Sequence, residues 1–165
     1  MPLLVRKIDF AKWNQRKILD GESPSADAIT RCTKTAGNTL SVWLIENEDE
    51  LNDAVLAIVT ANDHLETIDI LSIELDLLLN QGIILIEKLG LTLYTDFADR
   101  HRDISELNYD TLGKVAHVIV ESIRQKRRKR FSKKDLINLL TEAVRLNKIE
   151  WAGLKPDVQK YILLS

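Results

Sequence analysis

The sequence predicts an α+β fold, with a β-rich N-terminal layer over roughly residues 1–95 and a helical C-terminal third over roughly residues 110–163. Three observations support this. Alternating runs of β-forming residues occupy the N-terminal part, and apolar residues at helical spacing follow residue 110. Hydrophobic residues make up 45% of the chain and charged residues 29%, the balance of a globular protein. At 165 residues, we expect one domain, 1–165.

Two strands and two helices are expected in the first part of the chain. Residues 3–10 alternate loosely and residues 39–45 alternate clearly, so both segments predict strands. Ser23-Pro24 predicts a helix over about 26–31, because proline suits the first helical position after a capping serine. Acidic residues followed by apolar residues at helical spacing predict a second helix over about 49–60.

Residues 68–94 are the most apolar part of the sequence. Their first twelve residues follow a period of two, with one slip between Ile70 and Leu71 that a β-bulge would explain. A turn is expected at 80–82, followed by strands at 82–86 and 91–94. A helix over 75–89 is the alternative, because short apolar runs fit both periods. The isoleucines and Gly82 favour strands.

Three helices are expected after residue 110. Asp110 is the predicted cap of the first, whose apolar residues share one face. Ser132 and Asp135 form a short variant of the capping box, and they predict the start of the second. Pro156 predicts the start of a last, short helix.

Several function classes are disfavoured by composition. The six glycines never cluster, so no phosphate-binding or dinucleotide-binding loop is expected, and we predict no cofactor. A single cysteine, Cys32, rules out an intrachain disulfide. Residues 1–10 lack the apolar stretch of a signal peptide, and charged residues interrupt 68–94. We therefore expect a cytoplasmic protein that does not enter the membrane.

One segment carries residues typical of a metal or acid–base site. Asp99, His101 and Asp103 occupy alternate positions, so they share one face if the segment is extended and diverge if it is helical. Arg100 and Arg102 lie between them, which favours a surface of ion pairs over a site. We therefore lean against an enzyme and keep a metal-dependent enzyme that uses these three residues as an alternative.

Charge is unevenly distributed along the chain. Residues 35–87 contain eleven Asp or Glu and no Lys or Arg, whereas eight of the eleven residues in 124–134 are Lys or Arg. Cations suit the end of a helix, but Lys133 and Lys134 fall in the first turn of the next helix. Positive charge there is unfavourable by about 0.3–1 kcal/mol per residue. The basic segment 124–134 therefore predicts a negatively charged partner.

These observations predict an anion- or partner-binding site near the start of the helix at Ser132. Its expected members are Arg127, Arg128, Arg130, Ser132, Lys133 and Lys134. The expected function is a small interaction or regulatory module with complementary acidic (35–87) and basic (124–134) surfaces, which binds another protein or a second copy of itself. The alternative is a protein associated with RNA or DNA through phosphate contacts of 124–134.

Overall fold

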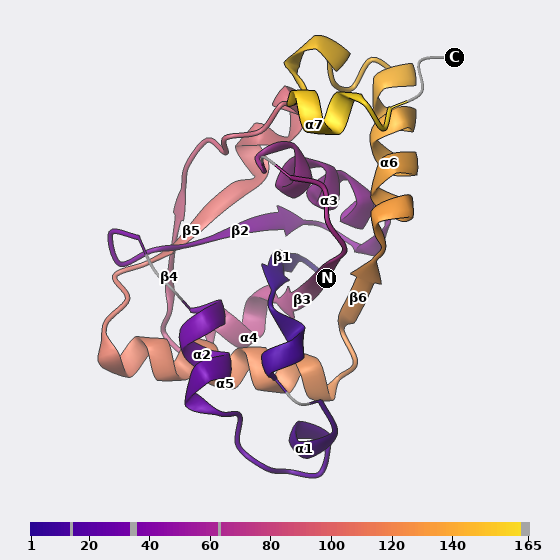
Figure 1. Cartoon of the computed structure of the whole chain (residues 1–165). Helices are drawn as coiled ribbons and strands as arrows, with labels where there is room; N and C mark the ends of the chain where they lie inside the picture. Colours follow the sequence, from indigo (N-terminus) through magenta and orange to yellow (C-terminus); the bar gives the residue numbers. More distant parts are fainter. Residues whose placement is uncertain (14, 34–35, 63, 163–165) are drawn as a thin grey trace.

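A six-stranded antiparallel sheet forms the centre of the computed structural model, which describes residues 1–13, 15–33, 36–62 and 64–162 (Figure 1). The strand order is β4-β5-β2-β1-β3-β6, and all neighbouring strands are antiparallel. The strands are β1 (Leu3–Ile8), β2 (Leu40–Ile45), β3 (Ile68–Glu74), β4 (Ile84–Glu87), β5 (His101–Ser105) and β6 (Arg128–Phe131).

Helices cover both faces of the sheet, so the protein has three layers (Figure 1). One face packs against α3 (Leu51–Thr60), α6 (Lys133–Arg145), α7 (Pro156–Gln159) and the 3-10 helix η3 (Thr95–Arg100). The other packs against α1 (Gln15–Leu19), α2 (Ala26–Cys32), α4 (Leu75–Leu79) and α5 (Tyr109–Arg124). Further 3-10 turns are η1 (Phe10–Lys12), η2 (Glu48–Glu50) and η4 (Trp151–Gly153). None of the helices within the described ranges has the length and apolar character of a bilayer-crossing segment.

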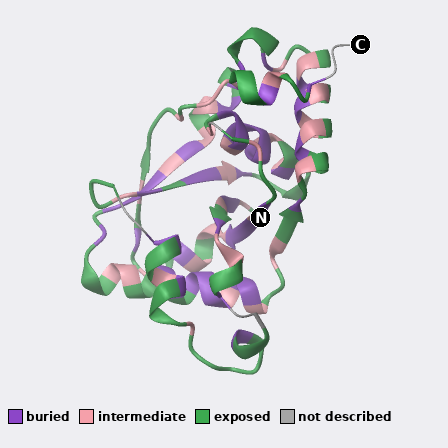
Figure 2. Cartoon of the chain, viewed as in Figure 1, coloured by how far each residue is buried: buried purple, intermediate pink, exposed green. Residues whose placement is uncertain are grey.

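Each face of the sheet has its own buried cluster, because alternate residues of a strand point to opposite faces. In β1, Leu3 and Val5 belong to the α3 side, whereas Leu4 and Ile8 belong to the α5 side. Figure 2 shows the buried residues concentrated in the sheet and in the helix surfaces that face it. A sheet covered on both faces explains why β3 is buried or half-buried at every position.

The predicted α+β class is confirmed, together with strands β1 and β2 and helices α3, α5, α6 and α7. The capping box of α6 is also confirmed: Ser132 Oγ accepts from the Asp135 N–H at 3.2 Å, and Asp135 Oδ2 accepts from the Ser132 N–H at 2.8 Å. The prediction placed no strand after residue 95. Strands β5 and β6 do lie there, and helices separate the strands of the N-terminal part.

Two predicted helix caps were wrong by two residues. Helix α2 is capped by Ser25 and not by Ser23, because the Ser25 hydroxyl accepts from the Ala28 N–H at 3.2 Å. Helix α5 is capped by Asn108 and not by Asp110. The Asn108 side chain accepts from two N–H groups of the first turn and forms a capping box with Thr111.

The segment 68–94 differs most from its prediction. Strand β3 pairs with β1 in unbroken register, so the slip at Ile70–Leu71 reflects burial on both faces and not a bulge. Residues 75–79, predicted as strand, form the short helix α4. Residues 91–94 were predicted as a strand and lie outside the sheet. The Thr92 hydroxyl instead lies 2.8 Å from the hydroxyl of Thr60, at the end of α3.

The central strands β1 and β2 separate partway along their length. Their pairing ends at Val5 and Trp43, although β1 continues to Ile8 beside β3 and β2 begins at Leu40 beside β5. The sheet is therefore split at one end. Helix α3 ends at Thr60, close to the same end, and the segment that follows it lies beside the split.

The close approach of Gly90 to the sheet gives a test of this packing. An added Cβ at Gly90 would overlap the Trp43 ring and lie 2.9 Å from His101 Cβ. We expect Gly90→Ala to lower the free energy of unfolding by about 1–3 kcal/mol.

Gly113→Ala is the matched control, because that position in α5 has no atom within 4 Å of an added Cβ. It should raise the free energy of unfolding by about 0.5–1 kcal/mol. Urea denaturation measures the free energy of unfolding of both variants. Equal effects of the two would contradict the close packing of Gly90 against Trp43 and His101.

Candidate anion-binding cleft

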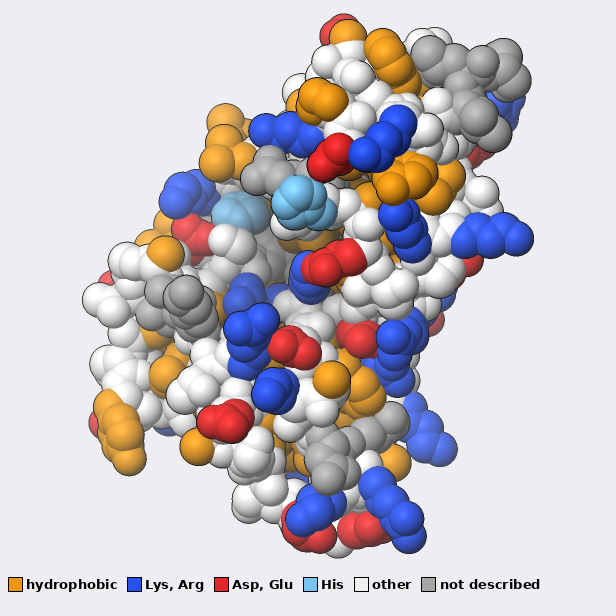
Figure 3. All heavy atoms as spheres, viewed as in Figure 1, with side chains coloured by type: hydrophobic (Ala, Val, Ile, Leu, Met, Phe, Trp, Pro, Cys, Tyr) orange, Lys and Arg blue, Asp and Glu red, His pale blue; other side chains and the backbone are white. Residues whose placement is uncertain are grey.

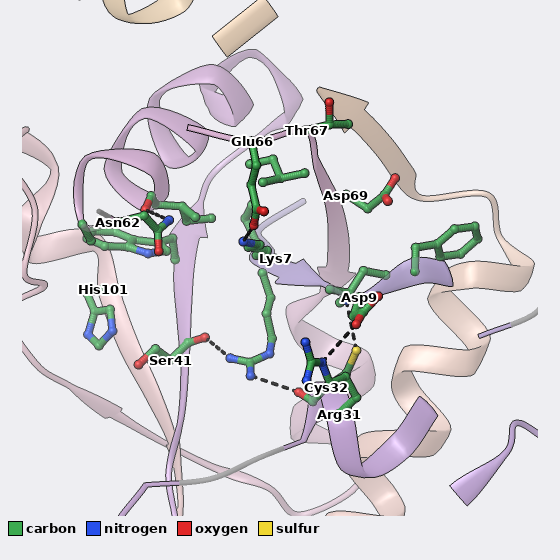
Figure 4. Close-up of a pocket in the computed structure, with 18 of the residues that line it drawn as sticks. Lys7, Asp9, Arg31, Cys32, Ser41, Asn62, Glu66, Thr67, Asp69 and His101 are labelled. Carbon is green, nitrogen blue, oxygen red and sulfur yellow. Dashed lines mark hydrogen bonds and ion pairs between the residues drawn. The ribbon is translucent and has the colours of Figure 1, made fainter. Parts of the chain in front are cut away.

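A cleft of about 820 Å³ opens where β1 and β2 separate, a volume typical of ligand sites. It is lined by the separated ends of β1 and β2, the start of β3, the C-terminal ends of α2 and α3, and the loop after β4. Figure 4 labels ten of the polar residues that line it, contributed by these elements and by β5: Lys7, Asp9, Arg31, Cys32, Ser41, Asn62, Glu66, Thr67, Asp69 and His101.

Arg6 bridges the split in the sheet. Its Nη1 donates to the Ser41 carbonyl at 2.6 Å, and its Nη2 donates to the Cys32 carbonyl at 3.0 Å, so it joins β1 to β2 and to α2. Its Nε is buried and has no hydrogen-bond partner within the described ranges. Both acceptors are neutral carbonyls, so the hydrogen bonds do not neutralise the guanidinium.

The carboxylates that line the cleft are already engaged by other cations. Asp9 pairs with Arg31 at 3.0 Å, Glu66 with Lys7 at 2.8 Å, and Asp69 with Arg128 at 2.6 Å. Burial lowers the pKa of the Arg6 guanidinium, and interaction with Cys32 acts in the opposite direction. Arginine nevertheless stays protonated in proteins. Arg6 is therefore a partly buried cation that forms no ion pair with any residue the structure describes.

Cys32 helps to fix the wall of the cleft. Its Sγ accepts hydrogen bonds from the Asp9 N–H at 3.2 Å and from Trp13 Nε1 at 3.0 Å, and its side chain is buried. These bonds hold the end of α2 against the chain that follows β1. The Cys32 carbonyl is thereby placed for its bond with Arg6.

His101 and Asp103 lie on β5 at the opposite side of the cleft from α2. His101 Nε2 lies 3.7 Å from Asp103 Oδ1, and His101 Nδ1 lies 3.0 Å from the Lys88 carbonyl oxygen. Asp103 also accepts from Ser41 Oγ and from Lys88 Nζ, each at 3.3 Å. The Asp103 carboxylate thus accepts from donors of two other segments, β2 and the loop after β4.

Asp99 does not join this pair. Strand β5 begins at His101, so Asp99 lies in the preceding 3-10 helix η3, where alternate residues do not share a face, and its side chain is exposed. Of the two conformations considered for 99–103, the extended one therefore holds only for His101 and Asp103. Within the described parts of the chain, no three His, Cys, Asp or Glu side chains are grouped so that they could hold a metal ion.

The basic segment 124–134 is divided between structural and exposed positions. Arg127 pairs with Glu74 and Arg128 with Asp69, and all four side chains are partly buried. Arg128 also stacks on the Phe10 ring, with its guanidinium carbon 3.9 Å from the ring centroid. The acidic and basic segments therefore meet within one chain, where they attach β6 to β3.

Other cations of the basic segment lie at the surface. Lys129, Arg130 and Lys134 are exposed, and Arg130 lines the cleft. Lys133 lies over the Tyr161 ring at 3.9 Å, which lowers the pKa of Tyr161. On the face seen in Figure 3, Lys and Arg side chains gather around the middle of the molecule, with acidic side chains among them.

The start of α6 provides fewer free donors than the sequence suggested. The Lys133 N–H donates to Thr67 Oγ1 at 3.3 Å, and the Asp135 N–H donates to Ser132 Oγ. Hydrogen bonds from Ser132 lower the pKa of the Asp135 carboxyl, which places a negative charge at this helix end. Anion binding around Ser132 stays a prediction, and the structure places Arg130, alone of the six predicted residues, in the cleft.

Sequence reasoning missed Arg6, although a signal was present. Arg6 lies between Leu4 and Ile8 in the alternating pattern of the first strand, and both of these leave the sheet on the same buried face. A cation in line with two core residues is unusual, because charged side chains are rarely buried without a partner, and Arg6 is accordingly only partly buried.

Comparisons with known protein families, curated proteins and solved structures find no match.

Removal of Arg128 tests the structural part of the basic segment. Arg128→Ala leaves Asp69 partly buried without its ion pair, so we expect the free energy of unfolding to fall by about 1–3 kcal/mol. Lys134→Ala, at an exposed position in the same segment, should change it by less than about 0.5 kcal/mol. Chemical denaturation measures the free energy of unfolding of both variants. Similar small changes in the two would show that both cations are merely solvated.

Proposed function

We propose that this chain is a small, non-enzymatic interaction module of the cytoplasm, which holds an anionic group of a partner protein against Arg6. The observation that carries the proposal is the partly buried guanidinium of Arg6 at the site where the sheet splits, which forms no ion pair with the residues that the structure describes and donates only to neutral carbonyls. Partial burial of a charge without a counterion carries a desolvation cost. An anion in the cleft offsets that cost and can accept from the Nη groups of Arg6, because the Nη1 end of the guanidinium is exposed whereas Nε is buried.

The surroundings of Arg6 support binding of an external anion. The cleft's own carboxylates are held by Arg31, Lys7 and Arg128, and the exposed Arg130 adds positive charge at the rim. A negatively charged partner is therefore attracted to the cleft and meets no unpaired acid among its described residues. Another protein or a second copy of this chain, which also carries exposed acidic residues, fits this description.

The non-enzymatic part of the proposal rests on the polar groups near the cleft. The Ser41 hydroxyl donates to Asp103, so it is not paired with His101 as an activated nucleophile would be. The cytoplasmic part rests on the single cysteine of the chain, Cys32, which is a buried thiol.

Anion-dependent stability tests the proposal. Sodium acetate and sodium phosphate are each titrated against sodium chloride at constant ionic strength, and unfolding is followed by denaturation. An anion at ten times its dissociation constant should raise the free energy of unfolding by about 1.4 kcal/mol. Arg6→Met should fold, because the apolar side chain suits a site with no counterion, and it should lose the anion effect.

Lys134→Gln is the matched control, since it removes an exposed cation outside the cleft. It should respond to anions like the wild type. The proposal fails if neither anion stabilises the wild type, or if Arg6→Met responds as strongly as the wild type does.

Association with RNA or DNA is a second candidate function. It is favoured by Lys129, Arg130 and Lys134, which are exposed and form no ion pair with the described residues. Phosphate contacts of this kind weaken steeply with salt. The charge reversals Lys129→Glu and Lys134→Glu should then abolish binding to a single-stranded RNA, measured by fluorescence anisotropy at low salt. Absence of wild-type binding at low salt would remove this candidate.

A further inference from the structure

The cleft also presents apolar side chains to solvent. Leu89 and Leu91 line it and are 73% and 89% exposed, and neither belongs to the buried cluster of either sheet face. Single exposed leucines are ordinary, but two in the wall of one cleft form a patch that favours contact with an apolar ligand.

The loop that carries these leucines is held in place. The Gly90 N–H donates to the Ala98 carbonyl at 2.9 Å, and Gly90 is so close to the Trp43 ring and to His101 that no side chain fits there. Leu89 and Leu91 therefore flank an anchored residue. Their exposure follows from the fixed backbone and not from a chain end that moves freely.

The charge of the cleft specifies the polar end of a ligand. Arg6 and Arg130 are its cations without an ion pair among the described residues, whereas Lys7 and Arg31 already hold carboxylates. The Arg6 guanidinium itself carries one positive charge, which a monoanion balances. A carboxylate also suits guanidinium geometry.

We infer that the cleft binds a carboxylate joined to an apolar chain, with the carboxylate on Arg6 and the chain on Leu89 and Leu91. This inference rests on the proposed function of the cleft and adds the chemical class of the ligand. Two sources have this chemistry: a small alkanoic acid, and the C-terminal residue of a partner protein with an apolar side chain. The volume of about 820 Å³ admits either one.

A series of straight-chain carboxylates tests the inference. Acetate, butanoate, hexanoate and octanoate are titrated by calorimetry at constant ionic strength and below micelle formation. Affinity should rise about two- to fourfold for each added CH₂, fourfold being the value of full burial. The double variant Leu89→Ser/Leu91→Ser should lose this dependence on chain length but keep the affinity for acetate. Arg6→Met should lose binding of the whole series.

Neutral alcohols of the same lengths are the control for apolar attraction alone, and they should bind at least tenfold more weakly than the carboxylates. To distinguish the two sources, a tetrapeptide ending in leucine is compared as free acid and as C-terminal amide. Tighter binding of the free acid than of hexanoate identifies a protein C-terminus, and weaker binding identifies a small acid.

If acetate binds through Arg6 but affinity does not change with the length of the carboxylate chain, the inference is overturned and the proposed function stands. The same holds if the serine variant keeps the wild-type dependence on chain length. Loss of every anion effect would instead remove the proposed function itself.

Discussion

The guanidinium of Arg6 lies where the ladder between β1 and β2 would otherwise continue. Pairing of the two strands ends at Val5 and Trp43, and the next contact between them is the bond from Arg6 to the Ser41 carbonyl. The same side chain reaches the Cys32 carbonyl at the end of α2. Arg6 thus joins the separated ends of β1 and β2 and holds the end of α2 beside them. The cleft lies where this charged side chain, and not a regular ladder of backbone hydrogen bonds, connects the two strands.

The rest of the fold stabilises this arrangement from a distance. Two buried clusters hold the sheet between its helix layers, so one irregular end is tolerated. Ion pairs between the acidic and basic segments attach β6 to β3, and this pairing brings Arg130 to the rim of the cleft. The separation of acidic and basic segments had suggested an external partner, but two of the basic residues pair with acidic residues of the same chain. Arg6 and Arg130 are the cleft cations without an ion pair among the described residues.

The sequence predicted those helices and strands that are specified by residues close together in the chain. Ser132 with Asp135 located the start of α6, and the alternation of β2 located a strand. Strand β6 was missed because Arg and Lys have no strand preference, and its existence depends on pairing with distant β3. The cleft was missed for a similar reason. It results from the separation of two strands, and only the position of Arg6 between two core residues hinted at it.

The most direct test of the Arg6 site is a ¹H–¹⁵N correlation spectrum of arginine Nε–H groups during acetate titration. Burial protects the Arg6 Nε–H from exchange with water, so its signal should be visible in the free protein and absent from Arg6→Met. We predict that this signal shifts and saturates, because a carboxylate on the Nη groups of Arg6 changes the environment of the buried Nε–H, while the Arg128 signal stays in place through its bond to Asp69. A saturable response of other residues with an unmoved Arg6 signal would contradict the assignment of Arg6 as the anion site.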